Sequence, residues 1–470
     1  MSRSIDDLTW LPIIDRSAGP LYRSIADALD LDIKAGRIAE GIRLPPQRLL
    51  AERLGVDFTT VTRAYAEAAR RGLVEGRVGQ GTFVRLHRAD RPAEMGAGFR
   101  QEIPSVDLRM NAPPLPGEQG LQDALRHDMG TFAAGLGLDL LLRYQQVGGS
   151  PADRQAGADW LRGRLDVPSE RVLVCAGAQG ALLALLSVLC EPGDLVCCEA
   201  LTYPGFRSLT AHLRLRLAPI AMDSDGLLPD AFEEACRDHS PKALYCTPTL
   251  HNPTTATLPL ERRKALVDIA RRHGVPIIED DAYGALAPDG PPPLAALAPE
   301  VVFHVSGLAK PVSPALRIAY LAVAEPRQLS RLAAAVRATT GMASPLTAAL
   351  ATHWIGSGMA AEIVTGIRRE TAARHAIAME TLPAELIAAS SSAFHLWLRM
   401  PGEWTRGEFT ARLRPADVGI VGSDAFAVSA PPEAVRIALG TAKDRPSLRD
   451  ALQLVADLLA EAPAMSSLLV

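Results

Sequence analysis

The sequence has few lysines, few aromatic residues and no long apolar run. Of the 49 basic residues only five are lysines, and aromatic residues make up 5 % of the chain. The longest apolar run, around 181–190, is too short to span a bilayer. The first residues, MSRSIDDLTW, lack the apolar stretch of a secretory signal. We therefore expect a cytoplasmic protein that does not insert into a membrane.

Cysteine is scarce as well, and its distribution argues against disulfide or metal chemistry. None of the cysteines shows the CxxC spacing of a metal site, and most lie in apolar stretches. We interpret them as reduced thiols of a cytosolic protein, and we predict no metal site. The six are Cys175, Cys190, Cys197, Cys198, Cys236 and Cys246.

Length and composition indicate a globular protein of two or three domains. The chain has 470 residues, of which 48 % are hydrophobic and 22 % are charged. The net charge of −4 hides an asymmetry, because the stretch 34–88 contains eleven basic and five acidic residues. Such a stretch either meets a polyanion or forms a solvated arginine-rich face, and charge alone does not decide between them.

Residues 1–88 have the pattern of three helices followed by two strands. Apolar residues recur at helical spacing over 20–36, and a second, short helix lies within RLPPQRLLAERLGV. Asp57 can cap a third helix over FTTVTRAYAEAARR, and LVEGRVGQGTFV is typical of two strands joined by a glycine turn. The pattern predicts a winged helix-turn-helix, a fold that binds DNA and also serves as a protein-interaction module.

The sequence of these segments resembles the GntR family of bacterial transcription regulators across helix, turn and wing. The resemblance implies that double-stranded operator DNA is the partner, although any single arginine here could be an ordinary surface residue. Phe58 stands where the family often has arginine, so base reading could shift to Arg63 or to a contact between Phe58 and a thymine methyl. The implied DNA-binding residues are Arg43, Arg48, Thr59, Thr60, Arg63, Gly79 and Gly81.

A segment rich in glycine, proline and charge follows the head. Residues 89–105, ADRPAEMGAGFRQEIPS, show no helical or strand periodicity. We predict a linker between the head and a larger domain over 106–470.

The larger domain alternates strand-like runs with amphipathic helical stretches. This alternation is typical of a largely parallel α/β sheet with helices on both faces. Ligands of such sheets lie at the carboxyl ends of the strands, so polar residues at these ends are candidates for a site. The strand-like runs are RVLVCA, DLVCCEA, ALYCTPT, VPIIED, VVFHVS and IAYLAVA.

Three of these strand ends carry candidate binding groups. RVLVCA leads into Gly177–Gly180 at a helix start, where exposed amides suit a phosphate, although many α/β turns look alike. VPIIE ends in Asp280 and Asp281, and such a carboxylate often only caps a loop. VVFHVS is followed by Lys310, and Arg317 comes seven residues later.

Together these pieces resemble the fold-type I aminotransferases of class I/II across the whole larger domain. The resemblance implies the α/β fold of the pyridoxal-phosphate-dependent transferases, with pyridoxal 5'-phosphate as cofactor. The matching stretches are YQQVGG (Tyr144–Gly149), GAQGAL, LTYPGF, TPTLHNPTT, IIEDDAYG, SGLAKPVSPALRIAY, SAFHLWLRMP and EAVRIALG.

The resemblance assigns a role to each candidate residue. Lys310 would form the Schiff base, and Asp280 would keep the pyridine nitrogen protonated. Asn252 and Tyr283 would bind the ring hydroxyl, and Tyr203 would stack on the ring. The phosphate would be held by Ala178, Gln179, Ser306 and Arg317.

Two further residues are assigned to an effector. Arg436 lies in the strand AVRIAL, where it would grip the carboxylate of an amino acid or else form an internal ion pair. Gly149 of the YQQVGG stretch is placed at the same site. Two departures from relatives concern the cofactor: Ala309 replaces a common serine before Lys310, and Thr255 replaces the glycine of NPTG. Each could change the affinity or orientation of the cofactor.

A GntR-type head on an aminotransferase-like domain is the layout of the MocR subfamily of regulators. The resemblance implies a homodimer that senses an amine or amino acid through external aldimine formation and changes its binding to DNA. The alternative is an active aminotransferase with an accessory DNA-binding head, and because the catalytic set is intact the sequence does not exclude it. A regulator with an empty cofactor site is disfavoured, because Lys310, Asp280 and Arg317 are all retained.

Overall fold

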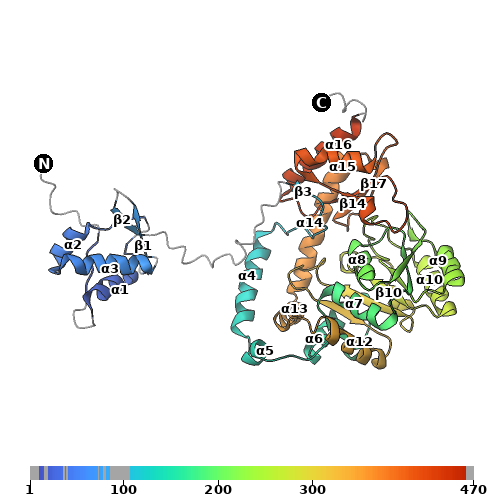
Figure 1. Cartoon of the computed structure of the whole chain (residues 1–470), viewed down its shortest axis with the longest axis horizontal. Helices are drawn as coiled ribbons and strands as arrows, with labels where there is room; N and C mark the ends of the chain where they lie inside the picture. The colour runs from blue at the N-terminus through green and yellow to red at the C-terminus, as the bar shows by residue number, and fades with distance from the viewer. Residues whose placement is uncertain are drawn as a thin grey trace. The chain divides into compact units, whose positions relative to one another are not determined.

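The structure is a computed structural model that describes residues 10–14, 20–34, 37–38, 41–71, 73–77, 81–84 and 106–461. The chain divides into two compact units, 1–102 and 103–470 (Figure 1). The predicted linker 89–105 and Gly79 lie outside the described residues. Within the described ranges, no helix is both long enough and apolar enough to cross a membrane.

The first unit contains the three predicted helices and the predicted two-stranded wing. Its elements are α1 (Leu21–Lys34), α2 (Gln47–Leu54), α3 (Phe58–Arg70), β1 (Val74–Arg77) and β2 (Gly81–Val84). β1 and β2 pair antiparallel. α2 ends at Gly55, whose φ of 62° closes the helix in the left-handed conformation that glycine adopts without strain. The winged helix-turn-helix is confirmed.

One apolar cluster holds this unit together. α2 contributes Leu50 and α3 contributes Val61 and Tyr65, all buried, and Trp10 and Ile25 pack with them. The Tyr65 hydroxyl donates to the backbone oxygen of Pro45 at 2.8 Å, which ties α3 to the segment before α2. The two helices of the helix-turn-helix are therefore fixed relative to each other.

The second unit is built on a seven-stranded sheet of order β4-β12-β11-β10-β9-β5-β6. Six of its strands coincide with the strand-like runs of the sequence, so the α/β fold is confirmed. All are parallel except β12, which runs antiparallel to β11 and β4. The bounds are β4 (Val172–Cys175), β5 (Leu195–Glu199), β6 (Arg216–Ile220), β9 (Ala243–Cys246), β10 (Ile277–Asp280), β11 (Val302–Gly307) and β12 (Ala319–Ala322).

Both faces of this sheet are covered by helices. Successive side chains of a strand point to opposite faces, so each buried strand contributes apolar residues to both. Ile277 of β10 joins one apolar cluster and Ile278 joins the other. The first cluster includes α6 (Pro151–Leu161), α9 (Pro229–His239), α10 (Leu260–His273) and α13 (Pro345–Ser357). The second includes α7 (Gly177–Leu189), α8 (Pro204–His212) and α12 (Pro326–Thr339).

A smaller sheet of order β13-β14-β17-β16 follows near the C-terminus. Its strands are β13 (Ile387–Ala389), β14 (His395–Arg399), β16 (Val421–Gly422) and β17 (Ala434–Ala438), and it packs with α15 (Arg406–Leu413) and α16 (Arg445–Ala460). Other elements are α4 (Gln119–Ala134), α5 (Leu138–Leu142), α11 (Leu294–Leu297), β7 (Met222–Asp223) and β8 (Gly226–Leu227).

Two connections join the sheets of this unit. α14 (Met359–Thr381) buries Ile363 and Ile367 in a cluster of the large sheet and Ile377 in the cluster of the small sheet (Figure 1). The segment that opens the unit forms β3 (Val106–Asp107), which pairs in parallel with β15 (Val418–Gly419). This pairing carries the residues after β3 to the ends of the large-sheet strands.

Candidate functional site

Lys310 and Asp280 lie close together near the carboxyl ends of neighbouring strands of the large sheet. Asp280 is the last residue of β10, and Lys310 follows β11, the parallel neighbour of β10. Among the charges that shift the pKa of Asp280 is that of Lys310. The two residues therefore share one site at the strand ends, where α/β sheets bind their ligands.

Asp280 is buried, and its two oxygens have different surroundings. Oδ2 accepts a hydrogen bond from the Tyr245 hydroxyl at 2.8 Å, whereas Oδ1 has no partner among the described residues. Burial raises the pKa of Asp280 to about 6, and the Tyr245 hydrogen bond opposes that rise. An unpartnered buried carboxylate oxygen is costly, so Oδ1 is a candidate acceptor for a donor that a ligand supplies.

The neighbouring Asp281 belongs to a different cluster. Its Oδ2 lies 3.4 Å from Arg164 Nε and 3.8 Å from Nε2 of His304, and His304 also contacts the buried Glu279 at 2.9 Å. Glu279 points to the face opposite Asp280, as alternation along β10 requires. Asp280, and not Asp281, is therefore the acid beside Lys310.

The amine of Lys310 is held in surroundings that favour its neutral form. Nζ donates a hydrogen bond to the backbone oxygen of Asn111. Burial, together with the positive charge of Arg436, lowers the pKa of Lys310 to about 8. A larger fraction of this lysine is unprotonated at neutral pH than of a solvated lysine, which makes it a better nucleophile.

Asn111 joins three parts of the site and was not among the residues predicted from the sequence. Its Nδ2 donates to the Tyr283 hydroxyl at 2.9 Å and lies 3.2 Å from Nδ1 of His395, a residue of β14. Burial lowers the pKa of His395 to about 3, so the neutral ring accepts at Nδ1 and donates from Nε2 to the His251 backbone oxygen. Asn111 follows β3 in a proline-rich loop, and no local pattern marks it.

Arg436 of β17 lies at the same site as Lys310 and Asn111. Its Nη1 donates to Oδ1 of Asn252 at 3.1 Å, its Nη2 donates to the backbone oxygen of Arg109, and its guanidinium lies 5.0 Å from the centroid of the Phe426 ring. No carboxylate of the described residues forms an ion pair with it, and Nε has no partner among them. Burial lowers its pKa to about 10, so at neutral pH Arg436 is a buried cation with no anionic partner in the described part of the chain.

The start of α7 (Gly177–Leu189) is the candidate seat for an anion. α7 begins at Gly177, whose φ is 73°, and has no acidic residue in its first turn. A Cβ at Gly177 would lie 3.7 Å from the backbone of Arg317, and Gln179 Nε2 donates to the Tyr203 hydroxyl at 3.3 Å. The Arg317 side chain is exposed. Free amides at a helix start and a nearby arginine suit a phosphate.

The structure does not bring Ser306 to this seat. Its hydroxyl accepts a hydrogen bond from the Trp160 indole of α6 at 3.2 Å, on the face opposite α7. The next residue, Gly307, is the one that faces α7, because a Cβ there would lie 3.6 Å from that of Ala178. Strand alternation therefore separates Ser306 from the seat and leaves a glycine in its place.

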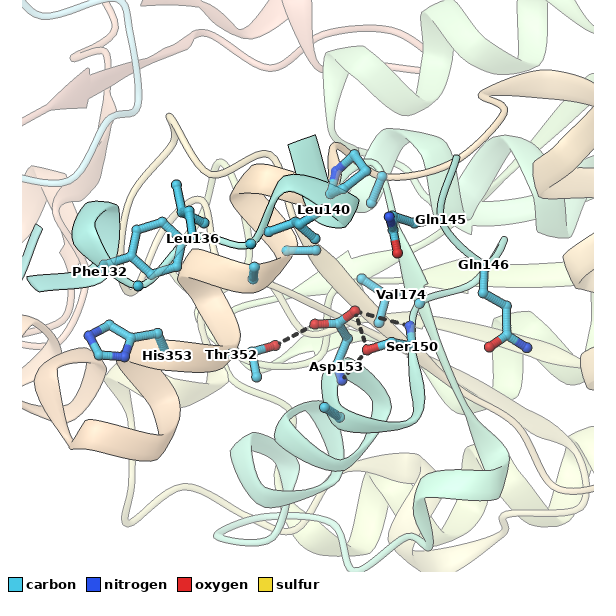
Figure 2. A pocket seen from close by; sticks show the side chains of 18 of the residues that line it. Phe132, Leu136, Leu140, Gln145, Gln146, Ser150, Asp153, Val174, Thr352 and His353 are labelled. Atoms are coloured by element: carbon cyan, nitrogen blue, oxygen red, sulfur yellow. Dashed lines mark hydrogen bonds between the residues drawn. The ribbon is translucent and has the colours of Figure 1, made fainter. Parts of the chain in front are cut away.

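Gly149 borders a different cavity, of about 480 Å³, between α4, α5, α6 and α13 (Figure 2). Lys310, Asp280, Asn252 and Arg436 do not line it. The carboxylate of Asp153 in its wall accepts bonds from Thr352 at 2.7 Å and from Ser150, as the dashed lines in Figure 2 mark. Ser150, Asp153 and Thr352 therefore satisfy one another.

The structure divides the predicted DNA-binding residues of the head into separate contacts. A Cβ at Gly81 would lie 2.8 Å from the Arg43 guanidinium, so the wing and Arg43 adjoin. The Arg48 guanidinium lies 5.8 Å from the centroid of the exposed Phe58 ring, whereas that of Arg63 lies 4.7 Å from the centroid of Tyr22 in α1. Arg63 is therefore directed toward α1.

The two threonines at the start of α3 also differ. Thr59 gives its backbone N–H, at 2.8 Å, and its hydroxyl to the carboxylate of Asp57. This bond lowers the pKa of Asp57, so an anion already occupies the helix start. The N–H of Thr60 donates to the backbone oxygen of Asp57 at 3.0 Å.

Both units match known protein families. Residues 106–453 match the family described as aminotransferase class I and II, and residues 21–84 match bacterial regulatory proteins of the gntR family. The uncharacterized HTH-type transcriptional regulator YdeF of Bacillus subtilis is 29 % identical, over 96 % of this chain and 97 % of YdeF. The probable rhizopine catabolism regulatory protein MocR of Rhizobium meliloti is 29 % identical, over 78 % of each chain.

The likeness to solved structures concerns the second unit. LysN, an α-aminoadipate aminotransferase of Thermus thermophilus, superposes with a TM-score of 0.68 at 22 % identity, over 80 % of this chain and 98 % of LysN. A multiple substrate aminotransferase of Thermococcus profundus superposes with a TM-score of 0.67 at 21 % identity, over 76 % of this chain and 91 % of that protein. At this identity the likeness concerns the fold alone.

Proposed function

The chain belongs to the aminotransferase class I and II family and carries a gntR-family head, and from this premise we propose that it is a transcription regulator of the MocR type. The head binds operator DNA. The body senses a primary amine or an amino acid, with pyridoxal phosphate as its cofactor. The regulator works as a homodimer in the cytoplasm, where the DNA is.

The residues around Lys310 fit pyridoxal phosphate. Asp280 would face the ring nitrogen with its unpartnered Oδ1, and Asn252 and Tyr283 would hold the ring hydroxyl. The start of α7 and Arg317 would bind the phosphate, and Tyr203, which bonds to Gln179 of α7, would lie against the ring. Pyridoxal phosphate, when bound, supplies an aldehyde carbon that exchanges one primary amine for another.

The observation that carries the proposal is the buried Arg436 cation near the Lys310 amine. Arg436 has a ring and two neutral oxygens around it but no carboxylate partner among the described residues, and its charge shifts the pKa of Lys310. A ligand with an amine at Lys310 and a carboxylate at Arg436 would satisfy both. An α- or ω-amino acid has this chemistry.

Each nearby side chain then has a definite task. Lys310, with its lowered pKa, holds or releases a proton at Nζ, and Asn111 orients it through its backbone oxygen. Asn111 also donates to the Tyr283 hydroxyl oxygen, which directs the hydroxyl proton away from Asn111. Arg436 binds the carboxylate and gives up its bond to Asn252 as the ligand enters.

The experiment is an absorbance titration of the purified full chain with candidate amines and amino acids. We expect a visible band from the bound cofactor, lost in Lys310→Ala, and a borohydride-trapped adduct on the peptide that contains Lys310. An adduct on Lys242, Lys264 or Lys443 would contradict the assignment. Lys264→Ala is the matched control, because this exposed lysine forms a surface ion pair with Glu261.

The same titration separates a sensor from an aminotransferase. A sensor stops when the amine is bound, and its spectrum returns when the amine is removed. An aminotransferase passes the amino group to the cofactor and needs a keto acid to recover. Rapid recovery only with a keto acid would favour the enzyme.

A further inference from the structure

Tyr245 lies beneath the cofactor-side acid, in the middle of the large sheet. It is a fully buried residue of β9, and it stands beside Ile278 in the parallel register with β10. Its hydroxyl donates to Oδ2 of Asp280 at 2.8 Å. The family comparison and the sequence assign no role to this residue, which looks like one more apolar position in a buried strand.

The Tyr245 ring is held by packing that does not involve Asp280. It stacks on the ring of Phe206 in α8, with 3.7 Å between the centroids and 9° between the planes, and Phe206 is itself fully buried. Because the ring is clamped, the position of its hydroxyl is set by β9 and α8. Asp280 therefore adapts to the hydroxyl, and the bond selects one orientation of the carboxylate.

We infer that Tyr245 is a positioning residue that keeps Asp280 ionised and turned so that its other oxygen faces the ligand site. The inference rests on the proposed function, because the partner of the free oxygen would be the ring nitrogen of pyridoxal phosphate. Oδ1 is the oxygen without a partner among the described residues, as this division of tasks requires.

Electrostatics makes the bond necessary. The pKa of Asp280 is raised to about 6, mainly by burial; the Tyr245 hydrogen bond opposes the rise, the charge of Asp281 adds to it, and the charges of His304 and Lys310 oppose it. Among these groups Tyr245 is the one that donates a hydrogen bond to the carboxylate. Without that bond the carboxyl group would hold its own proton at higher pH, and a protonated acid does not stabilise a protonated ring nitrogen.

The test is Tyr245→Phe in the full chain loaded with pyridoxal phosphate. The substitution keeps the ring that stacks on Phe206 and removes only the hydroxyl. We expect the pH at which the visible band of the bound cofactor changes to move upward by about one unit, the size of one lost hydrogen bond to a charge. Release of the cofactor into buffer should be roughly tenfold faster.

Tyr320→Phe is the matched control. Tyr320 is a buried tyrosine of β12 in the same sheet, on the face that packs against Gly157 of α6, and it forms no hydrogen bond with Asp280. Tyr320→Phe also removes one tyrosine hydroxyl from this sheet. The pH at which the visible band changes and the rate of cofactor release should therefore both stay at wild-type values. Equal spectra and release rates for Tyr245→Phe and Tyr320→Phe would overturn the inference.

Two further variants cover the other outcomes. Adding Tyr245→Phe to Asp280→Asn should change neither readout, because the bond no longer acts on a charge. If Tyr245→Phe does not fold, fluorotyrosine at position 245 keeps ring and hydroxyl while making a stronger donor, and the spectral transition should move to lower pH. No shift with fluorotyrosine would contradict the inference. A wild-type chain that binds no cofactor would instead refute the proposed function.

Discussion

Glu199 and Asp280 are two buried carboxyl groups near the Lys310 site, and they accept hydrogen bonds from different kinds of donor. Asp280 accepts a bond from a tyrosine, whereas Glu199 accepts one from the backbone N–H of Thr247 at 2.6 Å and leaves Oε2 without a partner among the described residues. Burial raises the pKa of Glu199 to about 8, and the charge of Asp280 adds to the rise. At neutral pH the site therefore holds one anion in Asp280 and one neutral acid in Glu199.

This difference makes a prediction about stability and pH. The folded protein keeps a proton on Glu199 that the unfolded chain releases above pH 4.5. Stability should therefore fall as pH rises from 4.5 to 8, by up to about 1.4 kcal/mol per pH unit from this group alone. Glu199→Gln removes that dependence while it keeps the acceptor for Thr247.

The measurement is thermal unfolding of Glu199→Gln and wild type between about pH 5 and 8. The variant should gain stability relative to wild type as pH rises. Glu403→Gln, at an exposed glutamate, is the control and should follow wild type. Parallel curves for Glu199→Gln and wild type would show that Glu199 is already ionised in the folded protein.

Arg436 supports a prediction about the ligand. Arg436→Ala should weaken binding of amino acids by about 2–5 kcal/mol, because it leaves a buried carboxylate without its cation. Simple amines of the same length lack the carboxylate and should bind as they do to wild type. Absorbance titrations with matched pairs of amines and amino acids measure both. Equal losses for both kinds of ligand would remove Arg436 from carboxylate binding.

Prediction from sequence works for residues whose position follows from a strand end. Asp280 and Lys310 each follow a recognisable strand, and parallel strands end at the same edge. Ser306 was misplaced because one residue along a strand changes the face, and the hydroxyl turned out to bond to Trp160. Asn111 could not be found, since the β3–β15 pairing that brings it to the site joins segments far apart in the chain.

At the scale of elements, the strand-like runs located six of the seven strands of the large sheet. β6 was missed because Arg216 and Pro219 within the strand, and Arg214 just before it, break the apolar pattern. Proline is tolerated there because β6 is at the edge of the sheet. The antiparallel direction of β12 could not be predicted from the sequence either, because an apolar run does not reveal the direction of a strand.

The contact between Arg48 of α2 and Phe58 of α3 leads to a prediction about DNA recognition. The stacking of Arg48 on Phe58 presents one cation at the junction of the two helices. If Arg48 reads a base, Arg48→Ala should weaken operator binding by about 1–3 kcal/mol and relax specificity at one position. Phe58→Ala should cause a smaller loss of operator affinity at the same base position, because Arg48 loses the ring that it contacts but keeps its charge.

Binding to a panel of operator variants at several salt concentrations distinguishes the alternatives. If Arg48 meets only phosphate, the loss should be uniform across sequences and the salt slope should fall by about one unit. Arg37→Ala is the control, because Arg37 pairs with Asp32 outside α2 and α3. A loss for Arg37→Ala as large as that for Arg48→Ala would assign the effect to net charge.

At the scale of the whole molecule, a sensor requires that the body and the head influence each other's binding. If an effector changes the affinity for operator DNA by some factor, operator DNA must change the affinity for the effector by the same factor. We expect the two factors to agree. Each affinity should change by at least about fivefold, the low end of typical allosteric coupling.

The measurement is a titration of the effector into cofactor-loaded protein with and without operator DNA. A DNA of scrambled sequence is the control and should leave effector affinity unchanged. Identical effector affinities with and without operator would contradict the sensor and leave the aminotransferase with an accessory head as the better account.

The pairing of β3 with β15 also has a consequence in time. Proteins are made from the N-terminus, and domains fold as units as they emerge. The head has its own core, which ends at Val84, whereas the segment that carries Asn111 has no strand to join until Val418 and Gly419 have been made. Arg436 comes later still. The head can therefore fold outside the ribosome long before the residues of the Lys310 site have all been made.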